Sequence, residues 1–161
     1  MSKIHTISAT TADPTVAAGT AQFLTPVVLG LQALVINGKQ AHWNVRGTNI
    51  QPNHELQDTV VSHAQDWSDT AAERIVALGL PIDARLATIT DKVKETAVPA
   101  GFTQWDEIVR DVISDIDAVL LDLRAAVDGL GEVDATSQDV AIEIQRGIEK
   151  DRWFLAAHLS S

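Results

Sequence analysis

Apolar residues recur at intervals of three and four positions along most of the chain, which is the spacing of helices that pack on one side. The pattern is clearest between Trp105 and Val127, where the opposite face carries acidic residues and Gly129-Leu130-Gly131 ends the run. The same spacing predicts three further helices, over about residues 15–44, 52–78 and 135–159. Because no alternating pattern typical of strands competes, the sequence predicts an all-α fold.

A long connection separates the second and third predicted helices. It covers residues 82–103, with one short helix expected around Asp91–Thr96, and its length suits a chain that crosses a bundle before returning. Pro26 marks either a new helix start or a kink in the first helix, and the sequence leaves both open. Four long helices with one long crossover form the ferritin-like arrangement. We therefore expect a flexible polar arm over residues 1–14 and one four-helix bundle over residues 15–161.

Composition narrows the class of protein. The 161 residues suffice for one domain with a substantial core, and 45% of them are apolar. The mean hydropathy of +0.05 is high for a lone soluble monomer, which favours apolar surface covered by a partner subunit. The absence of cysteine excludes thiolate chemistry. The longest apolar stretch, residues 26–36, is too short to span a bilayer and no signal peptide is recognisable, so we expect a cytoplasmic protein without membrane contact.

The charge of the chain disfavours nucleic acid as a partner. The net charge is −10, from 22 acidic and 12 basic residues, and the basic residues are scattered. Affinity for DNA rests mainly on cations that neutralise phosphates, so DNA binding is not expected. A strongly acidic assembly would instead concentrate cations near its surface and clefts.

Five potential metal ligands lie within 32 residues of a chain that has only five histidines; they are His42, His54, Asp58, Asp69 and Glu73. His54 and Asp58 are four residues apart, as are Asp69 and Glu73, so each pair shares one face of a helix. Imidazole and carboxylate ligands without thiolate suit iron, manganese or zinc.

The spacing of these pairs suggests a site shared by two chains. Along one straight helix Asp58 and Asp69 are about 16 Å apart, too far to hold one ion or a close pair of ions. The two pairs nevertheless share a centre, between His63 and Ala64. If two copies of the helix cross antiparallel at that centre, the ligands of one half face those of the other half and form two equivalent sites.

Three segments around these ligands resemble a known family; they are Lys39-Gln40-Ala41-His42-Trp43-Asn44-Val45-Arg46-Gly47, His54-Glu55-Leu56 with Asp58, and Asp69-Thr70-Ala71-Ala72-Glu73-Arg74. Together they are similar to the signature of the Dps family, the mini-ferritins named as DNA-binding proteins from starved cells. The match is dense over about 36 residues, and the helix layout agrees over most of the rest. The chain departs from the family at its N-terminus, where the basic tail that some members use on DNA is reduced to Lys3.

The resemblance implies a ferritin-like bundle assembled as a hollow homododecamer, with a di-iron ferroxidase centre between two-fold related subunits. It implies that His42 and His54 come from one subunit and that Asp69 and Glu73 come from its neighbour. Glu73 would bridge or anchor the first iron. Asp58 corresponds to the acidic residue beside the second histidine, although a role in orienting a ligand would explain it equally well.

Other residues receive a structural and a functional interpretation. Trp43 is most simply a core or interface anchor, but it corresponds to a tryptophan near the centre that could intercept a stray radical. Asp134 and Asp139 are either capping and solubility residues or part of an acidic pore that draws Fe(II) inward. The remaining histidines, His5, His63 and His158, are expected to be structural or to face solvent.

The leading hypothesis is therefore a ferroxidase that oxidises Fe(II), with hydrogen peroxide as the expected oxidant, and stores Fe(III) mineral, which protects against oxidative damage. The alternative is a metal-dependent hydrolase of amide or ester substrates that uses the same site, because an open metal position could generate hydroxide. No separate motif for a substrate pocket supports that alternative. A protein that only compacts DNA is disfavoured by the charge.

Overall fold

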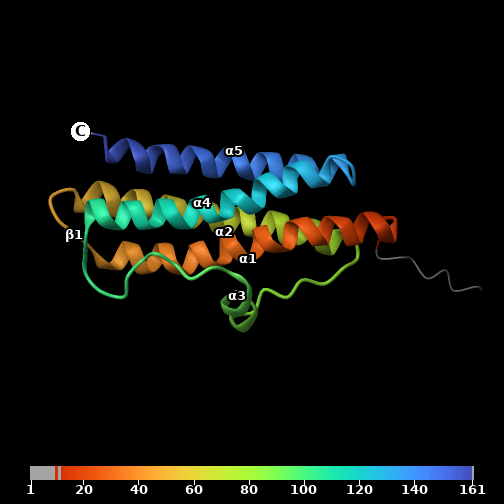
Figure 1. The fold of residues 1–161 in the computed structure, drawn as a ribbon, viewed down its shortest axis with the longest axis horizontal. Helices are drawn as coiled ribbons and strands as arrows, with labels where there is room; N and C mark the ends of the chain where they lie inside the picture. The colour runs from red at the N-terminus through yellow and green to blue at the C-terminus, as the bar shows by residue number, and fades with distance from the viewer. Residues whose placement is uncertain (1–9, 11, 161) are drawn as a thin grey trace, which may run out of the picture.

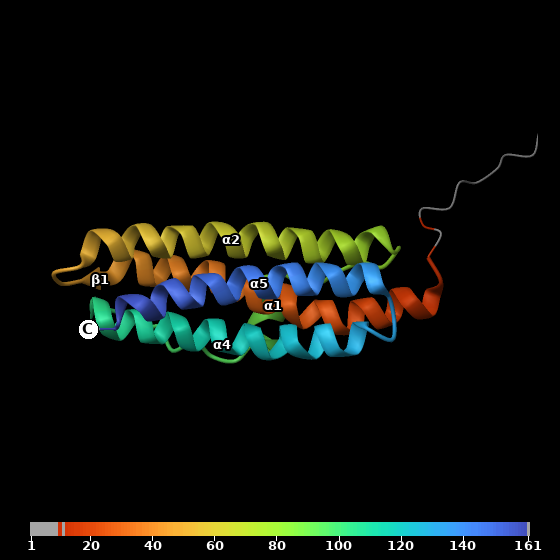
Figure 2. The same ribbon diagram turned by 90° about the horizontal axis from the view of Figure 1, so that it is seen from above.

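Four long helices form an antiparallel bundle in the computed structural model, which describes residue 10 and residues 12–160. They are α1 (Pro14–Asn44), α2 (Ile50–Ala77), α4 (Trp105–Leu130) and α5 (Ala135–His158). Figure 1 shows α1 and α5 on opposite sides of the bundle, and Figure 2 shows α2 and α4 flanking them. The long crossover carries the short helix α3 (Leu86–Lys92) and runs over the α1 side. The predicted all-α bundle with a long crossover is confirmed.

The ends of the helices form where the sequence supplies caps and turns. The Asp13 carboxylate accepts a hydrogen bond of 2.7 Å from the Thr15 N–H, and Pro14 opens α1, so both residues fix its start. The rest of the predicted arm, apart from Thr10 and Ala12, lies outside the described residues. Helix α1 continues through Pro26, which is therefore not a new start; its ring is exposed, where the missing N–H is cheapest to lose.

The core runs the length of the bundle and is built from the predicted apolar faces. Helix α4 has the most sharply divided apolar and polar faces, and every long helix contributes fully buried aliphatic side chains. The largest of these are Leu24, Leu31, Leu34, Ile75, Ile108, Ile116, Leu120, Leu123, Leu130, Ile144, Ile148 and Leu155. Helix α1 is also long and apolar enough to cross a membrane by length and composition alone, and half of its most apolar window is buried within the bundle.

The crossover differs from the prediction in two places. The short helix covers residues 86–92 rather than 91–96, because Ile89 packs against Leu29 and Ala33 of α1. Beyond it the Thr96 hydroxyl donates to the Asp115 carboxylate, which holds this stretch in a non-helical conformation. Two short strands, β1 (Val45–Arg46) and β2 (Thr103–Gln104), also form a parallel pair that the sequence pattern did not predict.

A hydrogen bond between a half-exposed histidine and a buried carboxylate joins α2 to α5. His63 Nδ1 lies 2.9 Å from an oxygen of Asp151, whose side chain is only 3% exposed, whereas the His63 side chain is 44% exposed. Burial raises the pKa of Asp151, and the hydrogen bond from His63 opposes that rise. His63 is thus a structural residue that satisfies a buried carboxylate.

Replacing His63 by alanine should therefore destabilise the fold. Leaving Asp151 buried without its partner is expected to cost about 2–4 kcal/mol of unfolding free energy. Without His63, burial acts on Asp151 unopposed, so the pKa of this carboxyl should be higher in the variant than in the wild type. Protonation of Asp151 removes the cost of its buried charge, so the deficit in stability should shrink as the pH falls from about 7 toward about 4. Urea unfolding followed by circular dichroism measures both effects. The exposed His158→Ala serves as control, and a deficit below about 0.5 kcal/mol at neutral pH would show that the pair contributes little.

Candidate metal centre

His42 and His54 hold each other in place where α1 passes into α2. Nδ1 of each ring lies 2.9 Å from the backbone carbonyl oxygen of the other residue, and the rings stack with their centroids 3.4 Å apart. A carbonyl oxygen only accepts hydrogen bonds, so each Nδ1 carries the proton and donates it. In the neutral form of each ring this leaves a free lone pair on Nε2, which is the tautomer that a metal-ligating histidine needs.

The turn between the two helices creates this arrangement. Gly47 adopts φ +117°, a left-handed conformation that residues with a side chain rarely take. A Cβ at this position would also lie 2.9 Å from Gln104 Oε1 and from Trp105 Cδ1. Glycine thus lets the chain reverse closely over the start of α4, which brings the last turn of α1 beside the first turn of α2.

Asp58 lies one turn of α2 after His54, beside the histidine pair. Its Oδ1 lies 3.7 Å from His42 Nδ1, and its carboxylate forms an ion pair with Lys39. The hydrogen bond from Lys39 holds the pKa of Asp58 below its ordinary value, with a smaller contribution from His42. The Lys39 pairing was not predicted, and a cation bound by Asp58 would have to compete with that ammonium group.

Asp69 and Glu73 lie on the exposed face of the other half of α2, one turn apart. Glu73 is about 28 Å from His54 along the helix axis. Among residues 10 and 12–160, no three histidine and acidic side chains converge as they would around an ion. The predicted ligands of one subunit therefore form two separate groups, which we call the histidine half (His42 and His54) and the acidic half (Asp69 and Glu73) of the predicted centre.

Comparison with known proteins agrees with this layout. A family model described as a ferritin-like domain matches residues 30–161. The chain is 32% identical to the DNA protection during starvation protein of Agrobacterium fabrum, over 78% of each chain. It is 34% identical to the protein of that name from Mycolicibacterium smegmatis, over 76% of this chain and 67% of the relative. The chain belongs to the Dps family.

A solved Dps structure shows how far this likeness extends. Dps from Microbacterium arborescens in the high iron form is 69% identical and superposes with a TM-score of 0.92, over 94% of this chain and 99% of that one. The ferritin-like fold and the Dps resemblance predicted from the sequence are thus confirmed. Membership of this family implies an iron-binding protein, whereas the individual ligands stay predictions.

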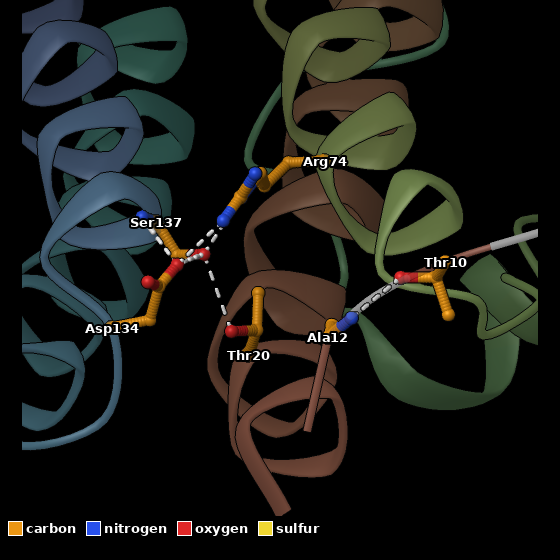
Figure 3. A network of polar contacts seen from close by, with 6 residues as sticks. All are labelled: Thr10, Ala12, Thr20, Arg74, Asp134 and Ser137. Carbon is orange, nitrogen blue, oxygen red and sulfur yellow. Dashed lines mark hydrogen bonds and ion pairs between the residues drawn. The ribbon is translucent and has the colours of Figure 1, made fainter. Parts of the chain in front are cut away.

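The other candidate residues differ in their exposure to solvent and in their hydrogen-bond partners. Trp43 follows His42 and is 63% exposed in the single subunit, so it does not belong to the subunit core. Asp139 is exposed on α5. Asp134 is not a free acid, because it caps α5 by accepting from the Ser137 N–H at 2.9 Å and pairs with Arg74 at 2.7 Å (Figure 3). The spacing Asp134-Ala-Thr-Ser137 before an apolar helix was a signal for that cap.

A cavity of about 780 Å³ lies away from these residues, between α1, the crossover and α4. Its lining combines aliphatic side chains with polar and charged ones and contains none of the five predicted ligands. The chemistry of this Dps chain is therefore expected on the exposed faces of α1 and α2 and not in this cavity.

Proposed function

We propose that this Dps protein oxidises Fe(II) at centres shared between two-fold related subunits and stores the Fe(III) product as mineral inside a hollow shell of twelve subunits. The observation that carries this proposal is the reciprocal hydrogen bonding of His42 and His54, which frees two Nε2 lone pairs at the end of the bundle. The second observation is the separation of the histidine half from the acidic half within one subunit, which supports a centre completed by a neighbouring subunit. The relative described in a high iron form supports iron as the substrate.

Each residue has a distinct task in this proposal. Neutral imidazoles of His42 and His54 bind Fe(II), and the carboxylates of Asp69 and Glu73 from the neighbouring subunit stabilise the more highly charged Fe(III). Two Fe(II) ions give up one electron each, so that 2 Fe(II), H₂O₂ and 2 H⁺ yield 2 Fe(III) and two water molecules. Because the electrons arrive as a pair, no hydroxyl radical is released.

The acidic charge of the chain suits a cytoplasmic protein that stores cations. Twelve copies of a chain of net charge −10 carry a total of about −120 before counterions bind. Such a shell would attract Fe(II) and repel DNA, so we propose protection by iron removal and not by compaction of the nucleoid.

Peroxide consumption during iron oxidation tests this function. We expect the protein to accelerate Fe(II) oxidation and to consume about half an equivalent of peroxide per iron, since each peroxide accepts two electrons. Absorbance of the ferric product, followed together with a peroxide electrode, measures the ratio. Oxidation no faster than in buffer would contradict a ferroxidase, and one peroxide per iron would contradict the paired transfer.

A further inference from the structure

A polar network ties the last turn of α2 to α1 and α5 (Figure 3). Arg74 donates from Nε to Ser137 Oγ at 2.9 Å and from Nη2 to Asp134 Oδ2 at 2.7 Å. The Thr20 hydroxyl of α1 donates to the same Ser137 Oγ at 3.2 Å, and Ser137 in turn donates to Asp134. The Ser137 hydroxyl thus accepts twice and donates once, which uses its full capacity.

Most of the network is shielded from solvent. Thr20 and Ser137 are completely buried, and the side chains of Arg74 and Asp134 are only 23% and 21% exposed. Hydrogen bonds from Ser137, followed by the one from Arg74, lower the pKa of Asp134 to about 2. Asp134 therefore stays ionised and pairs with Arg74 across the neutral range.

The position of this network matters for the acidic half-site. Arg74 directly follows Glu73, and α2 ends only three residues later, at Ala77. The last turn of a helix frays unless it is held. The side chains of Asp69 and Glu73 make no hydrogen bond or ion pair within the described part of the chain, so their placement depends on the backbone of α2, which Arg74 anchors.

We propose that Arg74 and Asp134 are positioning residues for the acidic half-site: by fixing the last turn of α2 on the start of α5, they hold Glu73 where the histidine half of a neighbouring subunit can meet it. This inference rests on the proposed function and gives Asp134 an anchoring role in place of a pore. Arg74 lies about 30 Å along α2 from His54, so its loss should leave the histidine half-site intact.

Mixing mutant subunits separates such a half-site defect from a general defect. An Arg74→Ala chain should supply a sound histidine half and a poor acidic half. Refolded together with His42→Ala/His54→Ala, it should restore oxidation at about a quarter of the centres, because half of the randomly formed dimers are mixed and each keeps one good centre. Refolded with Asp69→Ala/Glu73→Ala, it should restore none, since both chains then lack a working acidic half.

Metal binding gives a second readout that does not depend on turnover. Anaerobic titration calorimetry with Fe(II) should show affinity lowered about 10- to 100-fold in Arg74→Ala, the usual effect of losing a residue that orients ligands. Asp134→Asn should lower the affinity for Fe(II) similarly. Arg74→Lys should retain only part of the wild-type affinity, since lysine cannot donate to Asp134 and Ser137 in one fixed fork. The exposed Arg146→Ala on α5 is the matched control and should match the wild type.

The outcomes distinguish this proposal from the proposed function. Wild-type rates and affinity in Arg74→Ala would overturn the positioning role, as would restoration by both mutant partners or by neither in assembled mixtures. If Arg74→Ala does not assemble, Arg74→Lys and Asp134→Asn decide the matter by the same criteria. A wild-type protein that does not oxidise Fe(II) would overturn the proposed function and this inference with it.

Discussion

A chain with His42→Ala and His54→Ala is expected to oxidise Fe(II) no faster than buffer while still assembling normally. The two imidazoles are the nitrogen ligands of the proposed centre, and even residues that only orient ligands contribute about 10- to 100-fold to metal affinity or activity. Their side chains bond to each other's carbonyl groups, so the substitution removes two ligands and two hydrogen bonds at one end of the bundle. Stopped-flow absorbance of the ferric product measures the rate.

His158→Ala is the matched control for this variant. His158 is exposed near the end of α5 and donates from Nδ1 to the Phe154 carbonyl oxygen at 2.9 Å, a local contact far from the predicted ligands in sequence. We expect it to keep the wild-type rate. If the double variant also kept more than about a tenth of that rate, the histidine pair would not be part of the centre.

Substituting Gly47 by valine is expected to have the second largest effect, on both stability and oxidation. A β-branched side chain at φ +117° is strained, and the added atoms would meet Gln104 and Trp105. Strain of this kind costs about 1–3 kcal/mol, before any rearrangement of the turn. Because the turn sets His42 against His54, its rearrangement should separate the rings and slow Fe(II) oxidation by more than the loss of stability explains.

Gly101→Ala provides the control for that experiment. Gly101 has open space where a Cβ would be placed, and its φ lies outside the left-handed region. Urea unfolding and stopped-flow oxidation of both variants should show a large effect at Gly47 and almost none at Gly101. Equal behaviour of the two variants would mean that the turn does not determine the geometry of the histidine pair.

Much of the fold could be predicted because helices repeat their contacts along the chain. The long helices follow from apolar spacing alone, whereas the place of α3 depends on Ile89 meeting Leu29 and Ala33 across the fold. The β1–β2 pair likewise depends on two segments far apart in the chain. Each strand has only two residues, which is too short for an alternating pattern to show in the sequence.

The candidate site was predictable to a similar degree. The pairs His54/Asp58 and Asp69/Glu73 are visible because residues four apart share a helix face. The bonding between His42 and His54 depends on the shape of the turn at Gly47, and the partner of Asp58 depends on how α1 packs on α2. Asp134 could be a cap or a pore acid from the sequence, and the structure shows that it caps α5 through the Ser137 N–H and pairs with Arg74, a partner that the spacing did not reveal.

The shared centre is tested most directly by mixing two inactive proteins, His42→Ala/His54→Ala and Asp69→Ala/Glu73→Ala. In a dimer that contains one chain of each, one centre collects all four substitutions and the other keeps all four ligands. Random pairing makes half of the dimers mixed, so about a quarter of all centres should regain Fe(II) oxidation. If properly assembled mixtures stay at the rate that each variant shows alone, the shared centre is contradicted.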